Sequence, residues 1–127
     1  MGASSGSLHE DPEVLGPETI DRHRAIVSLM EEMEAADWYD QRVKATKNDE
    51  LREILAHTRD EEKEHAAMVL EWLRRSDPAL DEHLKTYLFT EGSIIGVEKA
   101  EKAGKAETGE AGDGSLGIGS LREGAKS

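Results

Sequence analysis

Apolar side chains recur at helical spacing through the middle of the chain, and no segment alternates them in the pattern of a strand. The first pattern starts at a Gly-Pro-Glu sequence over 16–18, which suits a helix start, and continues to about Thr46. The second runs from a cap at Asn48 to two arginines at 74–75, whose charges suit the carboxyl end of a helix. The short connection predicts two long antiparallel helices.

A third, shorter helix is predicted from the Ser-Asp-Pro sequence over 76–78 to Gly92. Its apolar face consists of Leu80, Leu84, Tyr87 and Leu88. The predicted fold class is therefore all-α, an antiparallel helical hairpin plus a short third helix over 17–92. We expect a flexible N-terminal segment over 1–16 and a flexible linker over 93–111, because glycine is frequent toward both ends.

Ionisable residues interrupt the apolar stripe of each long helix. The stripe of the second helix consists of Leu51, Leu55, Thr58, Glu62, His65, Val69 and Trp72. That of the first consists of Ala25, Leu29, Glu32, Ala36, Tyr39 and Val43. A buried carboxylate is costly unless it is paired or binds a metal, so the three ionisable residues require a common role.

A shared metal site supplies that role. Glu62 and His65 form a Glu-x-x-His motif, which places both side chains on one side of a helix, and Glu32 is a single carboxylate on the other helix. Carboxylate-bridged di-iron bundles use two helices of each kind. This chain carries half of such a set, which a two-fold dimer would complete as a ferritin-like four-helix bundle. The oxygen-rich ligands favour iron or manganese.

The same residues also fit plainer roles. A Glu-x-x-His sequence occurs by chance in an acidic chain, and Glu32 has the alternative of a structural ion pair with Arg22 or Arg59. Glu31 with Glu34 would gather cations beside the site, and His57, Glu61 and Glu64 form a neighbouring stripe for a weaker metal site. A plain solvated acidic face accounts for these last two groups equally well.

The composition narrows the function classes. The chain has 28 acidic and 16 basic residues and a formal net charge of -12, which disfavours binding to nucleic acid or to an anionic membrane surface. There is no cysteine, so disulfides and thiolate chemistry are excluded. The longest apolar run, over 66–70, is too short to span a bilayer, and no secretory signal begins the chain. We therefore expect a cytoplasmic setting.

Three stretches carry a resemblance to a known family: HRAIVSLMEEMEAADWYDQR, HTRDEEKEHAAMVLEWLRR and HLKTYLFTEG. Over roughly residues 8–95 the chain resembles the encapsulated ferritins. The resemblance implies a ferroxidase centre built only across a dimer interface, and dimers arranged in an open decameric ring. It further implies Glu32, Glu62 and His65 as iron ligands, Trp38 and Tyr39 close by, Glu31 and Glu34 at the approach to the site, and a secondary metal site at His57, Glu61 and Glu64.

The C-terminal segment over 112–127 resembles the cargo-loading peptide that docks proteins inside encapsulin shells. Leu116, Ile118 and Leu121 alternate there with glycine and serine, which suits an extended peptide bound in a shallow groove. This resemblance implies an encapsulin shell protein as partner. It also implies a location in the lumen of an encapsulin nanocompartment, in the cytoplasm of a bacterium or archaeon.

The sequence and the resemblance together predict a ferroxidase that oxidises Fe²⁺ with O₂ at an inter-subunit di-iron centre, for iron mineralisation and storage inside the shell. The competing hypothesis is a non-catalytic helical protein that binds metal or mediates interactions. Aerobic oxidation of iron distinguishes the two.

Overall fold

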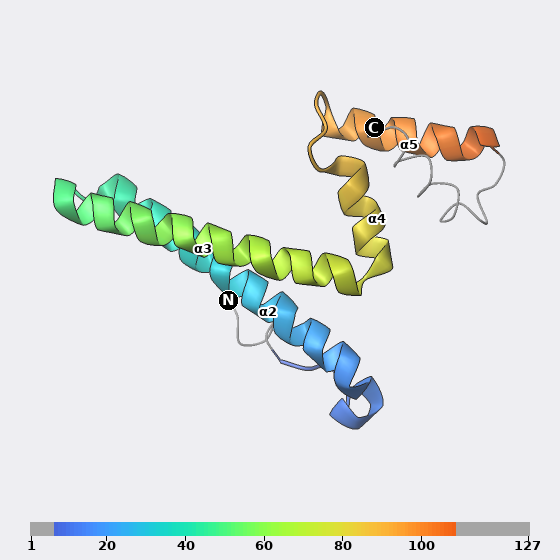
Figure 1. The fold of residues 1–127 in the computed structure, drawn as a ribbon, viewed down its shortest axis with the longest axis horizontal. Helices are drawn as coiled ribbons and strands as arrows, with labels where there is room; N and C mark the ends of the chain where they lie inside the picture. Colours follow the sequence, from blue (N-terminus) through green and yellow to red (C-terminus); the bar gives the residue numbers. More distant parts are fainter. Residues whose placement is uncertain (1–6, 109–127) are drawn as a thin grey trace. The chain divides into compact units, whose positions relative to one another are not determined.

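A computed structural model describes residues 7–108 of the chain, and that range contains helices and no strand. The helices are α2 (Pro12–Ala45), α3 (Asp49–Ser76), α4 (Pro78–Tyr87) and α5 (Ile94–Thr108) (Figure 1). They fall into two compact units, with α2 and α3 in the first and α4 and α5 in the second. The predicted all-α fold class is confirmed.

The first helix begins earlier than its sequence pattern predicts. Asp11 caps a helical turn at Pro12, because its side-chain oxygen accepts a hydrogen bond of 2.9 Å from the Glu13 N–H. Gly16 then leaves the helical conformation with φ 81° and ψ 163°, and the regular helix resumes at Pro17. Such a positive φ strains any residue that carries a Cβ, so glycine suits this break. A capped turn thus replaces part of the predicted flexible segment, whose residues 1–6 lie outside the described range.

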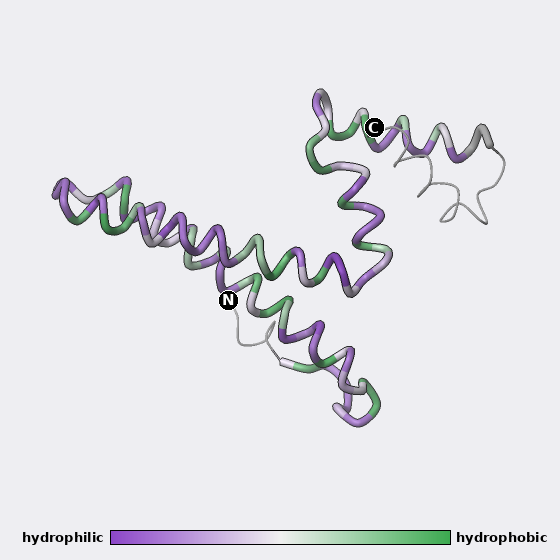
Figure 2. The backbone as a smooth tube through the Cα atoms, in the orientation of Figure 1, coloured by the Kyte–Doolittle hydropathy of each residue, from purple (hydrophilic) through white to green (hydrophobic). Residues whose placement is uncertain are grey.

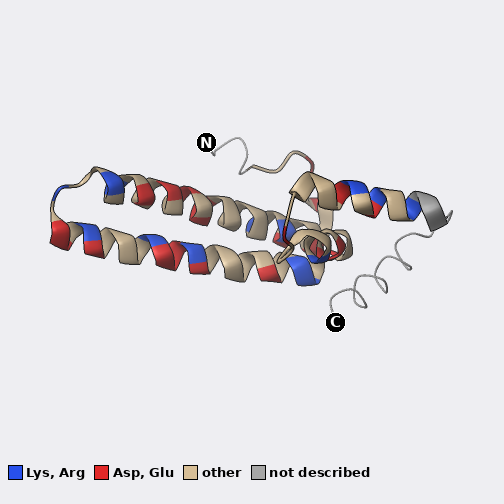
Figure 3. Ribbon diagram, turned by 90° about the horizontal axis from the view of Figure 1, so that it is seen from above, with Lys and Arg blue, Asp and Glu red and all other residues tan. Residues whose placement is uncertain are grey.

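The helices α2 and α3 form the predicted antiparallel hairpin and pack against each other at an angle, so that the N-terminal part of α2 diverges from the end of α3 (Figures 1 and 3). Asn48 caps α3 as predicted, with its side-chain oxygen accepting from the Leu51 N–H at 2.9 Å. Arg52 reaches back across the connection and donates to the carbonyl oxygens of Val43, at 3.3 Å, and Thr46. A guanidinium at the carboxyl end of α2 satisfies carbonyls that the helix leaves open, and so it holds the connection closed.

Few described side chains are buried within the single chain. Ala36, Ala66 and Leu73 are the buried apolar residues of the described range. Large apolar side chains of the hairpin remain exposed, namely Val14, Ile26, Met33, Trp38, Leu51, Ile54, Met68 and Trp72. Two helices share only one line of contact, so the hairpin by itself leaves the rest of its apolar surface uncovered.

The second unit begins with α4, which Asp77 caps by accepting from the Leu80 N–H at 3.1 Å. The helix ends at Tyr87, before the predicted end at Gly92. The Thr90 hydroxyl donates to the Tyr87 carbonyl at 2.7 Å, and Phe89 adopts a left-handed φ of 63°. This local hydrogen bond turns the chain away from the helix before it reaches the glycine.

The structure differs from the predicted flexible linker over 93–111, because Ile94–Thr108 form α5. The Ser93 hydroxyl oxygen accepts from the Gly96 N–H at 3.0 Å, which caps the start of the helix. Lys102 pairs with Glu98 at 3.3 Å, one turn apart. Alanine, glutamate and lysine are strong helix formers, and here they outweigh the glycines that suggested a coil.

Figure 2 shows that apolar and polar residues are interspersed along the long helices. In the described part of the chain, no helix combines the length and the apolar character that a membrane crossing requires.

Candidate metal centre

Glu32, Glu62 and His65 converge on one point of the hairpin. Glu32 comes from the middle of α2, and the other two come from successive turns of α3. One ligand atom from each lies within 4.8 Å of the others. His65 Nδ1 lies 3.3 Å from Glu62 Oε1 and 3.6 Å from Glu32 Oε1. Among the described residues, these three are the acidic and histidine side chains whose ligand atoms converge closely enough to hold a metal ion.

The three side chains are partly exposed, with 29% of the Glu32 side chain, 22% of Glu62 and 47% of His65 accessible to solvent. A hydrogen bond with Glu62 raises the pKa of Glu32, as do burial and the negative charge of Glu62, while His65 acts in the opposite direction. Two carboxylates so close repel each other when both are ionised. A cation between them would relieve this repulsion.

The structure does not contain the alternative ion pair of Glu32 with Arg22 or Arg59. Arg59 is hydrogen-bonded instead to Asp40, at 2.9 Å, and to Asp60, at 3.0 Å. Arg22 donates to the Thr19 hydroxyl at 3.3 Å. The close ionisable neighbours of Glu32 are therefore the other two members of the cluster.

The donor set suits a hard or borderline divalent cation. Two carboxylates and one imidazole provide oxygen and nitrogen ligands without thiolate, which fits iron or manganese. One hairpin supplies two carboxylates and one histidine, half the protein ligands of a carboxylate-bridged di-iron centre. The exposed side of the cluster leaves room for ligands from elsewhere.

The other predicted site residues do not join this cluster. Glu31 is exposed and Glu34 half-buried, both on α2 beside it. His57 Nε2 pairs with Glu61 Oε2 at 3.2 Å on α3, while Glu64 is exposed and outside the cluster. These residues do not form a second converging group of three within the described range.

Trp38 is half exposed, and the Arg42 guanidinium lies 5.0 Å above the ring of Tyr39. Through this cation–π contact, the Tyr39 ring packs against Arg42. Leu116, Ile118 and Leu121 lie outside the described residues.

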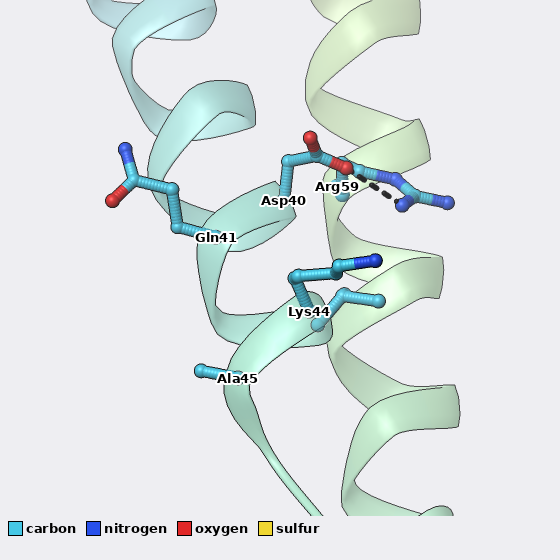
Figure 4. Close-up of a pocket in the computed structure, with 6 residues that line it drawn as sticks. Asp40, Gln41, Lys44, Ala45 and Arg59 are labelled. Atoms are coloured by element: carbon cyan, nitrogen blue, oxygen red, sulfur yellow. Dashed lines mark hydrogen bonds and ion pairs between the residues drawn. The ribbon is translucent and has the colours of Figure 1, made fainter.

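Two of the hollows on the described part of the hairpin have no counterpart among the predicted sites. A groove of about 490 Å³ is lined by Asp21, Arg24, Ala25, Ser28, Met68, Val69 and Trp72, and we call it the apolar groove. A second hollow, of about 480 Å³, is lined by Asp40, Gln41, Val43, Lys44, Ala45 and Arg59, and we call it the charged hollow. Figure 4 shows the Asp40–Arg59 ion pair bridging α2 and α3 in the charged hollow. The stripe position of Trp72 is the sequence signal that points to the groove.

The fold and the cluster together define a class of protein, an all-helical hairpin with a carboxylate and histidine ligand group across its two long helices. Residues 7–91 match the EncFtn-like family, and the chain belongs to that family.

Individual relatives agree with this assignment. The chain is 63% identical over 129 residues to the Encapsulated ferritin-like protein of Rhodospirillum rubrum, covering 96% of this chain and 92% of that protein. It is 36% identical over 86 residues to the Encapsulin nanocompartment cargo protein EncC of Myxococcus xanthus, covering 63% of this chain and 66% of that protein. A crystal structure of a Nitrosomonas europaea protein is similar with a TM-score of 0.67 and 61% identity, covering 69% of this chain and 97% of that one.

Proposed function

We propose that the chain is a ferroxidase that oxidises Fe²⁺ to Fe³⁺ with O₂ at a di-iron centre shared between two subunits. The observation that carries the proposal is the convergence of Glu32, Glu62 and His65 on one point of the hairpin. Iron is the substrate here. Two Fe²⁺ ions each give up one electron, and O₂ accepts both.

The dimer is part of the proposal because one hairpin holds only half of the ligands. Two copies related by a two-fold axis supply four carboxylates and two imidazoles, which match the ligand set of carboxylate-bridged di-iron bundles. The sparse core of the single hairpin supports the same assembly, since large apolar side chains remain exposed on it. The decameric ring of dimers stays a prediction from the family resemblance.

The proposal gives each group of residues a separate role. Glu32, Glu62 and His65 would hold the two ions, with the carboxylates supplying negative charge to balance the metal and the imidazole supplying a nitrogen ligand. Glu31 and Glu34 raise the local concentration of Fe²⁺ at the approach to the site. A weaker secondary metal ion at His57, Glu61 and Glu64, and a position of Trp38 and Tyr39 close to the centre, stay predictions from the family resemblance.

The relatives and the sequence of the C-terminal segment support a proposed cellular setting. One relative is described as encapsulated and another as an encapsulin cargo protein. We therefore place the chain inside an encapsulin nanocompartment, with residues 112–127 as its docking peptide and the shell lumen as the space for iron mineral.

Native mass spectrometry alongside aerobic Fe²⁺ oxidation tests the shared centre. We expect oxidation to follow the dimer population across a dilution series, with two iron ions per dimer. Asp40→Asn serves as a matched control, because it removes a carboxylate of the hairpin outside the cluster. A monomer with full activity would contradict the shared-site proposal, and binding without oxidation would support the non-catalytic alternative.

Co-expression with an encapsulin shell protein tests the docking segment. The full-length chain should co-purify with the shell, and a chain without residues 112–127 should oxidise iron normally but not load. Replacing Leu116, Ile118 and Leu121 with serine should act like the deletion, since each buried apolar contact contributes about 1.5–3 kcal/mol. Undiminished loading of this triple variant would show that another surface finds the shell.

A further inference from the structure

We propose that residues 112–121 bind to an apolar patch on the same chain until a shell displaces them. The patch lies at the connection between α4 and α5, and we call it the connection patch. It consists of Leu88, Phe89, Ile94 and Ile95. The proposal rests on the docking role proposed for residues 112–127, because it names what covers that segment before it docks.

The connection patch is open to solvent within the described residues. Leu88 is 42% exposed, Phe89 is 100%, Ile94 is 67% and Ile95 is 59%. Half of the eight residues over 88–95 are therefore large, apolar and uncovered. Single exposed apolar residues are common on protein surfaces, but a grouping of them marks a binding surface.

The backbone of the connection holds these side chains in place. The Thr90 hydroxyl donates to the Tyr87 carbonyl at 2.7 Å, and the Ser93 hydroxyl oxygen caps α5. Phe89 has a φ of 63°, which is costly for a bulky residue. Its exposed ring gains nothing from burial that would offset this cost. Contact with a further segment would supply that gain.

The helix α5 also lacks a cover for its first turn. It has 15 residues, two of them glycine, and isolated helices of about 12–15 residues are marginally stable in water. The pair of Lys102 with Glu98 adds only a small local contribution. Because Ile94 and Ile95 remain exposed, a segment that packs against them would stabilise the helix.

The length of chain after α5 indicates which segment can do this. The helix is about 22 Å long, and the eight residues from Thr108 to Leu116 span about 26 Å when extended. Leu116 can therefore return to the first turn of α5. Leu121 lies thirteen residues from Thr108, about 43 Å when extended, and so can reach Phe89 beyond that turn.

The order of residue types fits this return. No apolar residue larger than alanine occurs between Val97 and Leu116. Glycine occupies positions 109, 112 and 114, and it is the residue type that reversals of chain direction favour. The first large apolar side chains after the helix thus come where the chain has just enough length to regain the connection patch.

Binding to the patch and docking to a shell exclude each other, because both use Leu116, Ile118 and Leu121. A ligand that is free for only part of the time binds its partner with an apparent affinity reduced by that fraction. If the segment occupies the patch for about two thirds of the time, its affinity for the shell falls about threefold. The same factor should slow any reagent that attacks the covered side chains.

Thiol alkylation tests the contact, because the chain has no cysteine and Leu116→Cys introduces the sole thiol. We expect alkylation of the full-length variant to be at least about threefold slower than after a further Ile95→Ser or Phe89→Ser substitution. Ile54→Ser is the matched control, since Ile54 is 58% exposed, like Ile95, but lies on α3. It should leave the alkylation rate unchanged. Circular dichroism and sedimentation confirm that each variant folds and assembles.

Competition for the shell tests the consequence. Shell subunits are reassembled with equal, limiting amounts of wild-type and Ile95→Ser protein. The variant should be enriched in the particles by the same factor, about threefold, because its docking segment is always free. Ile54→Ser should load like the wild type.

The outcomes separate this inference from the proposed docking role. Equal alkylation rates with and without Ile95→Ser and Phe89→Ser would overturn the inference, as would equal loading of Ile95→Ser and the wild type. Slow alkylation that becomes fast on dilution would assign the segment to a neighbouring chain, which also overturns it. Full loading of the triple serine variant of Leu116, Ile118 and Leu121 would overturn the docking role, while slow alkylation without a shell would still support the contact.

Discussion

Two of the hollows between α2 and α3 have nearly equal volumes, about 480 and 490 Å³, but differ in their lining. In the charged hollow, Arg59 is hydrogen-bonded to Asp40 on the neighbouring helix, so the two charges satisfy each other within one chain. Beside the apolar groove, two carboxylates share one point with a histidine, and large apolar side chains remain exposed. A surface whose charges are paired within the chain stabilises the hairpin, whereas the cluster and the exposed apolar side chains remain open to a metal ion or a partner.

The largest expected effect is the loss of a cluster ligand. Glu32→Ala, Glu62→Ala and His65→Ala should each reduce the rate of iron oxidation at least about 100-fold, because the remaining ligands cannot hold both ions in place. Asp40→Asn, in the charged hollow, should keep the rate within about twofold. Stopped-flow oxidation measures all four variants, and wild-type rates in Glu62→Ala would refute the assigned centre.

An intermediate effect is expected at the approach to the cluster. Glu34→Ala should slow iron uptake a few-fold at low salt, because it removes a charge that attracts cations without removing a ligand. The difference from wild type should shrink as salt rises, since screening weakens the attraction. Single-turnover oxidation of pre-bound iron is the control and should be unchanged. A loss of that step would instead make Glu34 part of the centre.

A smaller effect, on stability alone, is expected in the charged hollow. Arg59→Met removes the ion pair with Asp40 and should lower the thermal midpoint by a few degrees, because exposed ion pairs stabilise weakly. Lys44→Met, at the same hollow, is the matched control for loss of one positive charge. Iron oxidation should be unchanged in both, and lost activity in Arg59→Met would link the two hollows.

The smallest effect concerns a charge group that lines neither hollow. Hydrogen bonds from Arg74 and Arg75 lower the pKa of Glu71 from 4.5 to about 2. A lowered pKa stabilises the folded state above pH 4.5, and this contribution is lost as the pH falls from 4.5 toward 2. Glu71→Gln should therefore lower the urea midpoint slightly at pH 7 and make no difference near pH 2. An equal decrease at both pH values would assign the effect to packing instead.

The helical hairpin follows from local features of the sequence. Apolar spacing, the Asn48 cap and the cations at 74–75 predict α3 closely, and the structure confirms these boundaries. The predicted helix boundaries differ from the structure where two local preferences compete. Glycine suggested a coil over 93–111, but alanine, glutamate and lysine form α5, and a Thr90 hydrogen bond ends α4 before Gly92.

The sequence by itself determined the two long helices and the stripe on which Glu32, Glu62 and His65 lie, because helical periodicity is a local property. Only the tertiary structure decided that Arg59 pairs with Asp40 instead of Glu32, and that Met68 and Trp72 border an open groove. These features depend on how far α2 is rotated and shifted against α3. Side-chain packing across the hairpin sets that relation, and spacing along one helix carries no record of it.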